Sequence, residues 1–206
     1  MRIGVVSDTH DRQEAVAESV RLLLEQQVEL ILHCGDIESP ETVRIFKPIP
    51  THFVFGNWDK DKVKLSAAIK DIGGTHYDTF GALVLAGKRV AWVHSHERHQ
   101  LRQLENADFF DYVFYGHTHV REQHRTGRTL VANPGALFRA NPKTCIVLDV
   151  ETGEIKPIIV PVKPQTTPHP VSAALDDSVG SMILPPGTVP ATPSPLPDTT
   201  PPAPPG

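Results

Sequence analysis

Five short polar clusters along the chain contain side chains that bind metal ions. Each cluster follows an apolar run, so each is expected to emerge where a buried strand ends. Carboxylates mixed with imidazoles suit manganese, iron, zinc or nickel better than magnesium or calcium, which prefer shells made of oxygen. This number of ligands can fill two metal sites with one carboxylate shared between them. The clusters are Asp8-Thr9-His10, Gly35-Asp36, Gly56-Asn57, His94-Ser95-His96 and Gly116-His117-Thr118-His119.

The first third of the chain alternates between strand-like and helix-like patterns. Because βαβ crossovers are right-handed, its three strands should be parallel, with their carboxyl ends on one side of the sheet. Asp8, Asp36 and Asn57 each follow one of these ends, so they are expected to share a site. The predicted strands are residues 2–7, 28–33 and 51–55, and the predicted helices are residues 12–27, a short helix capped by Ser39 with Pro40 at its first position, and residues 62–72.

The second half of the folded region reads mostly as strands. Glycines divide residues 73–93 into short pieces, which favours hairpins over further βαβ units. One more helix is predicted, and the whole pattern indicates an α/β fold of mixed sheets with helices outside. The predicted elements are strands at residues 90–93, 112–115, 122–125, 129–132, 145–150 and 154–160, and a helix at residues 101–107.

The composition divides the 206 residues into a folded domain and a tail. Of 20 prolines, five lie before Pro157 and fifteen lie from Pro157 onward. We therefore predict one domain over residues 1–162 and a Pro/Thr-rich tail over residues 163–206. Such a tail buries too little apolar surface to offset its ordering entropy, so disorder with polyproline II character is expected. It would serve as a solubilising tail or as a ligand for a proline-recognising partner.

Charge and cysteine content narrow the class of protein. The formal net charge of −4 gives no electrostatic footprint for nucleic acid. Cys34 and Cys145 are far apart and outside any CxxC spacing, which indicates a reduced, cytoplasmic compartment. The first apolar run is too short for a signal peptide or a membrane span. Strands near an open sheet edge would permit a homodimer.

The five clusters, taken in order, resemble those of the calcineurin-like metallophosphoesterases. The turn Asn133-Pro134-Gly135 after the last histidines is similar to that of the small YfcE-like phosphodiesterase branch, which includes the related retromer subunit. The resemblance covers about residues 1–160 and implies a four-layer αββα sandwich of two mixed sheets. The motifs that carry it are Ser7-Asp8-Thr9-His10-Asp11, Gly35-Asp36, Gly56-Asn57-Trp58-Asp59, His94-Ser95-His96 and Gly116-His117-Thr118-His119.

The resemblance implies a role for each candidate ligand. Two divalent transition-metal ions, manganese first and iron, nickel or zinc as alternatives, would lie about 3.5–4 Å apart and bind a hydroxide that attacks phosphorus. Asp36 would bridge the ions and Asn57 would bind through its amide oxygen. The glycines before Asp36, Asn57 and His117 are expected where a Cβ would crowd the turn. The implied ligands are Asp8, His10 and His119 on one metal, and Asn57, His94 and His117 on the other.

Several positions depart from the family pattern or allow two interpretations. Trp58 stands where many relatives carry a histidine assigned to the leaving group, which favours phosphodiesters or other good leaving groups, and it would stack on a base or cover the metals. Ser95 replaces a glycine, which matters only if its φ is positive. His96 would contact substrate or orient a ligand, and Arg139 would face phosphate or solvent. His33 is expected to be structural, and His52, His76, His99, His124 and His169 are expected on the surface.

The predicted function is a metal-dependent phosphodiesterase acting on a small phosphodiester or a nucleotide-like substrate. Its proposed catalytic residues are Asp36, Asn57 and His96. The alternatives are a catalytically weak scaffold and a nucleotide-binding sensor on the same fold. Scaffold relatives have lost ligands, whereas all seven ligand positions are filled here.

Overall fold

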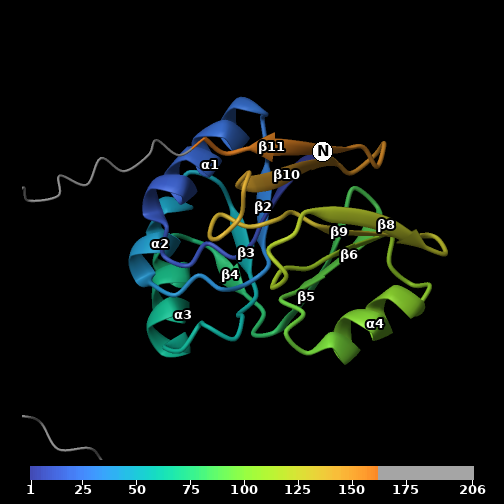
Figure 1. Cartoon of the computed structure of the whole chain (residues 1–206), viewed down its shortest axis with the longest axis horizontal. Coiled ribbons are helices and arrows are strands. Elements are labelled where there is room, and N and C mark those ends of the chain that lie inside the picture. The colour runs from blue at the N-terminus through green and yellow to red at the C-terminus, as the bar shows by residue number, and fades with distance from the viewer. Residues whose placement is uncertain (162–206) are drawn as a thin grey trace, which may run out of the picture. The chain divides into compact units, whose positions relative to one another are not determined.

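Two β-sheets and four α-helices make up residues 1–161, the part of the chain that this computed structural model describes (Figure 1). The first sheet has the strand order β11-β10-β1-β2-β3-β4 and the second has the order β5-β6-β7-β9-β8. Both mix parallel and antiparallel pairs, so the predicted α/β fold is confirmed. The elements are β1 (Arg2–Val6), α1 (Gln13–Glu25), β2 (Leu30–His33), α2 (Pro40–Ile45), β3 (Thr51–Phe53), α3 (Lys62–Asp71), β4 (Thr75–His76), β5 (Phe80–Leu85), β6 (Lys88–Val93), α4 (Arg98–Asn106), β7 (Tyr112–Phe114), β8 (Glu122–Thr126), β9 (Thr129–Asn133), β10 (Thr144–Asp149) and β11 (Ile155–Ile159).

The strands β1, β2 and β3 are parallel and end at the same level, as predicted. Val6 lies opposite His33 in the register of β1 and β2, and His33 lies opposite Phe53 in that of β2 and β3. The chain leaves all three strands at the carboxyl edge of the first sheet. The loops that carry Asp8, Asp36 and Asn57 are therefore neighbours in space although they are far apart in sequence.

Three apolar clusters define the layers. Alternation along β1 sends Val6 to the side of α1, α2 and α3, whereas Ile3 and Val5 face the second sheet and pack with Trp92. On the outer face of the second sheet, partly buried leucines of α4 pack against β6, β7 and β9. The order of the layers is therefore helices, first sheet, second sheet, helix. Figure 1 shows α1, α2 and α3 on one side of the two sheets and α4 on the other.

Local signals explain several element boundaries. Ser39 caps α2, because its side chain accepts a hydrogen bond from the Thr42 N–H, and Pro40 occupies the first helical position as predicted. The strands β5 and β6 form the predicted hairpin. The strand β4 differs from the prediction, because Thr75–His76 joins the first sheet parallel to β3 and takes part in no hairpin.

Other predictions concern the chain as a whole. The predicted tail at residues 163–206 lies outside the described residues. Within residues 1–161, no helix is long and apolar enough to cross a membrane. Cys34 and Cys145 are both buried free thiols.

Candidate metal centre

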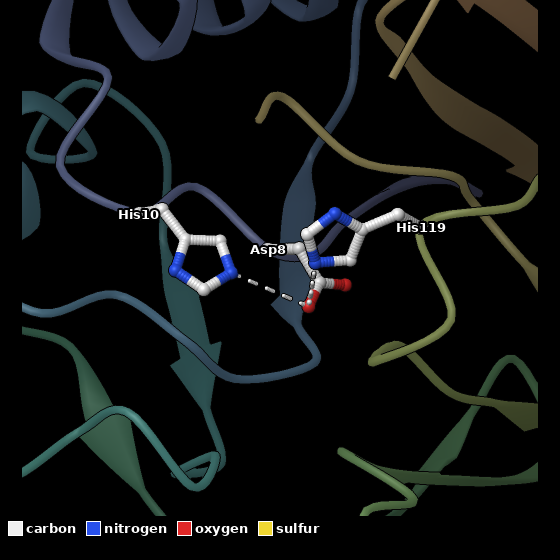
Figure 2. A group of neighbouring side chains, drawn as sticks. All are labelled: Asp8, His10 and His119. Carbon is white, nitrogen blue, oxygen red and sulfur yellow. Dashed lines mark ion pairs between the residues drawn. The ribbon is translucent and has the colours of Figure 1, made fainter. Parts of the chain in front are cut away.

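Loops from both sheets bring acidic and imidazole side chains together at the carboxyl edge. Asp8 and His10 follow β1, Asp36 follows β2, and His94 follows β6, and all four side chains are buried. His119 arrives from the loop after β7 and is half-buried. Figure 2 shows the rings of His10 and His119 on either side of the Asp8 carboxylate. The His119 Nε2 lies 3.3 Å from Asp8 Oδ1, and the His10 Nε2 lies 3.9 Å from the same oxygen.

The first candidate metal group consists of Asp8, His10 and His119, whose ligand atoms lie within 4.8 Å of one another. The His10 Nδ1 is 2.7 Å from Glu38 Oε1, so the carboxylate of Glu38 takes the Nδ1–H and leaves the lone pair on Nε2. This Nε2 is buried and has no hydrogen-bond partner within residues 1–161. It also lies 3.4 Å from Asp36 Oδ2. A lone pair facing carboxylate oxygens fits a bound cation.

The second candidate group surrounds His94. Its Nδ1 donates to the backbone oxygen of Cys34 at 2.8 Å, which directs Nε2 toward two oxygen acceptors. These are Asp36 Oδ2 at 3.1 Å and Asn57 Oδ1 at 3.0 Å. Asp8, Asp36 and His94 also fall within one possible metal group. Here too a proton or a metal ion must lie between the nitrogen and the oxygens.

The charges of this cluster move its pKa values in opposite directions. Burial disfavours the charged form of His94, but the hydrogen bond to Asp36 and the charges of Asp8 and Asp36 outweigh it and raise the pKa of His94. Burial also opposes ionisation of Asp36, yet the hydrogen bond and charge of His94 and the Trp58 N–H lower its pKa. These directions favour a proton shared between His94 and Asp36 when no metal ion is bound.

His117 is the most peripheral of the seven predicted ligands. Its side chain is exposed and its ring centroid is 5.2 Å from that of His94. Unlike His10, His94 and His119, the His117 imidazole makes no ion pair with a carboxylate within residues 1–161. The structure thus links six predicted ligands through a chain of contacts, in which Asn57 is joined through His94, and places the seventh beside them.

The backbone of the loops is held in the left-handed region at several non-glycine residues of the site. Such a conformation costs about 1 kcal/mol or more per residue, so the surrounding contacts must impose it. Ser95 belongs to this group, with φ of 73°, so the condition under which the replacement of glycine matters is met and the serine carries strain. The Ser95 hydroxyl donates to the backbone oxygen of Gly116 at 3.1 Å, which helps to hold it. The other residues are Asp8, His10, Asp36, His117 and His119, with φ between 41° and 72°.

The three glycines that precede Asp36, Asn57 and His117 all stand where backbone passes close to the candidate ligands, as predicted. A Cβ on Gly56 would lie 2.1 Å from Asp36 Oδ1. A Cβ on Gly116 would lie 1.9 Å from Ser7 Oγ and 2.8 Å from Asp8 Oδ2. These three contacts are far inside van der Waals distance, so a larger residue would displace a candidate ligand.

Asp59 has no role predicted from the sequence, yet it joins two of the loops. Its carboxylate accepts four backbone N–H groups, from Asp36 and Gly56 on Oδ2 and from Ile37 and Glu38 on Oδ1. Burial raises the pKa of Asp59, and the backbone hydrogen bonds oppose that rise. The sequence offers one signal for it, an acidic residue two positions after Asn57 in the Gly56-Asn57-Trp58-Asp59 motif. Glu38, the partner of His10, has no such signal.

The turn after β9 supports the loop that carries His117 and His119. The Asn133 amide donates to the Gly116 backbone oxygen and to Thr118 Oγ1, both at 3.1 Å, while its oxygen accepts the Gly135 N–H. This confirms the predicted tight turn. His33 is structural as predicted, because its ring contacts the Thr9 hydroxyl and accepts the N–H of Gly35.

A pocket of about 280 Å³ opens beside the cluster. Trp58 lines it with a side chain that is 55% exposed, and its backbone N–H donates to Asp36 Oδ1 at 2.9 Å. Arg139 also lines it, as does Phe138.

His96 and His52 differ in how far their side chains are buried. His96 is exposed, with its ring centroid 5.6 Å from that of His94 and 6.4 Å from that of His117. His52 corrects our prediction of a surface residue, since it is half-buried and hydrogen-bonded to the Tyr77 hydroxyl at 2.8 Å.

A family model, a curated relative and a solved structure that resemble this chain are all phosphoesterases or phosphodiesterases. The model of the calcineurin-like phosphoesterase superfamily domain matches residues 1–153. Phosphodiesterase MJ0936 of Methanocaldococcus jannaschii is 29% identical over 165 residues, which cover 78% of this chain and 99% of that protein. The solved structure of a novel archaeal phosphodiesterase has a TM-score of 0.73 and 29% identity, covering 77% of this chain and 99% of the other.

Two more distant structures share the fold. One is the phosphoesterase YfcE of E. coli, with a TM-score of 0.55, 19% identity, and coverage of 78% of this chain and 100% of the other. The second is a single mutant of Vps29 from Entamoeba histolytica, with a TM-score of 0.58, 17% identity, and coverage of 77% and 99%.

Proposed function

The chain belongs to the calcineurin-like phosphoesterase superfamily and is a hydrolase of phosphoric esters, and we propose that it cleaves small phosphodiesters with a centre of two divalent metal ions. One observation carries the proposal of a metal centre. The Nε2 atoms of His10 and His94 both point at carboxylate oxygens while their Nδ1 atoms are already held by acceptors. Such an arrangement of acceptors is stable only around positive charge.

We divide the candidate ligands between the two ions as the resemblance to the family motif implies. Asp36 would be shared, because its Oδ2 lies 3.4 Å from His10 Nε2 and 3.1 Å from His94 Nε2. When bound, the two ions would supply a hydroxide nucleophile near neutral pH and would offset the charge that develops on the phosphoryl oxygens. We assign Asp8, His10 and His119 to one ion, and Asn57, His94 and His117 to the other.

Three residues would act on the substrate. The Asn57 amide oxygen faces His94, so its NH₂ is free to donate to a phosphoryl oxygen. The His96 ring stands beside the rings of His94 and His117 and would bind the same phosphoryl group. Trp58 cannot protonate a leaving group, so the site favours diesters whose leaving group departs as a stable anion.

The test combines metal analysis with hydrolysis of bis(p-nitrophenyl) phosphate. Asp36→Asn should lower the bound metal from two ions toward one and reduce turnover by at least about 100-fold, since the shared carboxylate is lost. Asp71→Asn is the matched control, because Asp71 is an exposed residue of α3. Full activity with two bound ions in Asp36→Asn would refute the assignment.

Two further outcomes concern the substrate and the class of function. Faster cleavage of simple alkyl monoesters than of diesters would contradict the proposed substrate class. A wild-type protein that binds metal and a nucleotide but turns over none of these esters would identify a sensor or scaffold on the same fold.

A further inference from the structure

Three arginines beside the candidate metal centre have no ion-pair or hydrogen-bond partner for their guanidinium groups within residues 1–161. They are Arg12, Arg121 and Arg139, and all three are exposed. Elsewhere half of the guanidinium groups have acidic partners, as in the contacts of Arg21 with Glu18 at 2.8 Å and of Arg128 with Asp111 at 2.9 Å. Within the described chain the other unpaired arginines are Arg98 and Arg102 of α4, so three of the five unpaired guanidinium groups lie beside the candidate metal centre.

Two of these arginines share one aromatic ring. The Cζ of Arg12 lies 4.6 Å from the centroid of Phe138, and the Cζ of Arg139 lies 4.9 Å from it. The same ring packs against His10, with centroids 4.8 Å apart. Two like charges beside one ring repel each other, and a bound anion would relieve that repulsion. Two carboxylates line the same pocket: Asp36, a candidate metal ligand, and Glu38, which contacts His10 at 2.7 Å.

The positive charge continues away from the metal centre. Arg12 and Arg139 line the pocket of about 280 Å³ that contains Asp36 and Trp58. A second hollow of about 380 Å³ shares Arg139 and His119 with the first and adds Arg121. Arg139 therefore stands between the two hollows, with an arginine on each side.

The arginines and the two metal ions together carry more positive charge than one phosphodiester group can balance. A phosphodiester carries one negative charge, and two divalent ions held by the carboxylates of Asp8 and Asp36 and carrying one hydroxide would keep one net positive charge, which is enough to balance it. Guanidinium groups recognise phosphate through paired hydrogen bonds, and their placement next to the metal ligands leaves them available for a second anionic group of the same molecule.

We propose that the substrate is a phosphodiester that carries a second, terminal phosphate. This inference rests on the proposed function and names its substrate class. The scissile phosphate lies at the metal centre, the second phosphate binds Arg12 and Arg139 around Phe138, and the rest of the molecule extends toward Arg121. Trp58, on the wall of the first pocket, contacts the base or aryl group between them.

The first experiment uses two substrates that differ by one phosphate. They are thymidine 5′-(p-nitrophenyl phosphate) and the same compound with a 3′-phosphate. We expect the metal-loaded protein to prefer the 3′-phosphorylated compound by about tenfold in kcat/KM, which corresponds to about 1.4 kcal/mol, and mainly through KM. Arg139→Gln and Arg12→Gln should each reduce this preference several-fold, whereas Arg98→Gln, an unpaired arginine of α4, should keep it.

The second experiment separates this inference from the proposed function. Calorimetry on the metal-free protein compares thymidine 3′,5′-bisphosphate with thymidine 5′-monophosphate, and the bisphosphate should bind more tightly in wild type but not in Arg139→Gln. Equal kcat/KM for the two esters, or a preference that Arg98→Gln reduces as much as Arg139→Gln, would overturn the inference. A protein that hydrolyses neither ester but keeps the bisphosphate preference would reject the hydrolytic function and retain the phosphate subsite.

Discussion

Replacement of Asp59 by asparagine tests whether one buried carboxylate holds the candidate metal centre together. Asp59 is only 3% exposed, and its two oxygens accept four backbone N–H groups at 2.7 to 3.0 Å. These groups belong to the loop after β2 and to Gly56 in the loop after β3. The four bonds therefore tie together the segments that carry Asp36 and Asn57.

The expected loss of stability follows from the number of hydrogen-bond acceptors that Asp59→Asn leaves for the four N–H groups. Asparagine keeps one oxygen, which can serve two of the four N–H groups, while its NH₂ faces the other two. Each buried N–H left without an acceptor costs about 1–3 kcal/mol, so Asp59→Asn should lower the free energy of unfolding by about 2–6 kcal/mol. The side chain hardly changes in volume, so loss of packing contributes little.

Urea unfolding followed by tryptophan fluorescence at pH 7, in the presence of a chelator, gives the measurement. Asp71→Asn, on the exposed face of α3, controls for the loss of one negative charge. Metal binding provides a second readout, because displacement of Asp36 and Asn57 should weaken it in the folded variant. A loss of less than about 1 kcal/mol would refute the reasoning, since the four bonds would then contribute no more than a surface contact.

Two further predictions concern histidines of the same region. Glu38→Gln should weaken metal affinity about 10- to 100-fold, because a neutral amide holds the Nδ1–H of His10 less strongly, and competition with a chromophoric chelator measures this loss. His33 is fully buried, and burial lowers its pKa to about 3, below the 6.5 of the unfolded chain. The unfolded state therefore binds the proton first, so stability is complete above about pH 6.5 and falls on acidification toward pH 3 by up to about 1.4 kcal/mol per pH unit. His33→Gln should remove about 2 kcal/mol of the stability difference between pH 7 and pH 5 in urea unfolding of the metal-free protein, and an unchanged difference would contradict this account.

The sequence was sufficient to predict where the candidate ligands meet but not how they are held. Parallel strands end at one edge, so the positions of Asp8, Asp36 and Asn57 followed from the pattern of apolar runs. The role of Asp59 did not, because it depends on the directions of four N–H bonds, which no residue type encodes. The left-handed φ of Ser95 likewise results from tertiary contacts that override the preference of a serine.

His10 and His94 are oriented in the same way and differ in the group that accepts the hydrogen bond from Nδ1. In both His10 and His94 an acceptor holds Nδ1 and leaves Nε2 toward the Asp36 carboxylate. For His94 the acceptor is the neutral carbonyl of Cys34, whereas for His10 it is the carboxylate of Glu38. A carboxylate partner makes an imidazole more basic and therefore a stronger ligand. The ion at His10 should consequently bind more tightly than the ion at His94, so metal should load in two steps, and Glu38→Gln should bring the two steps together.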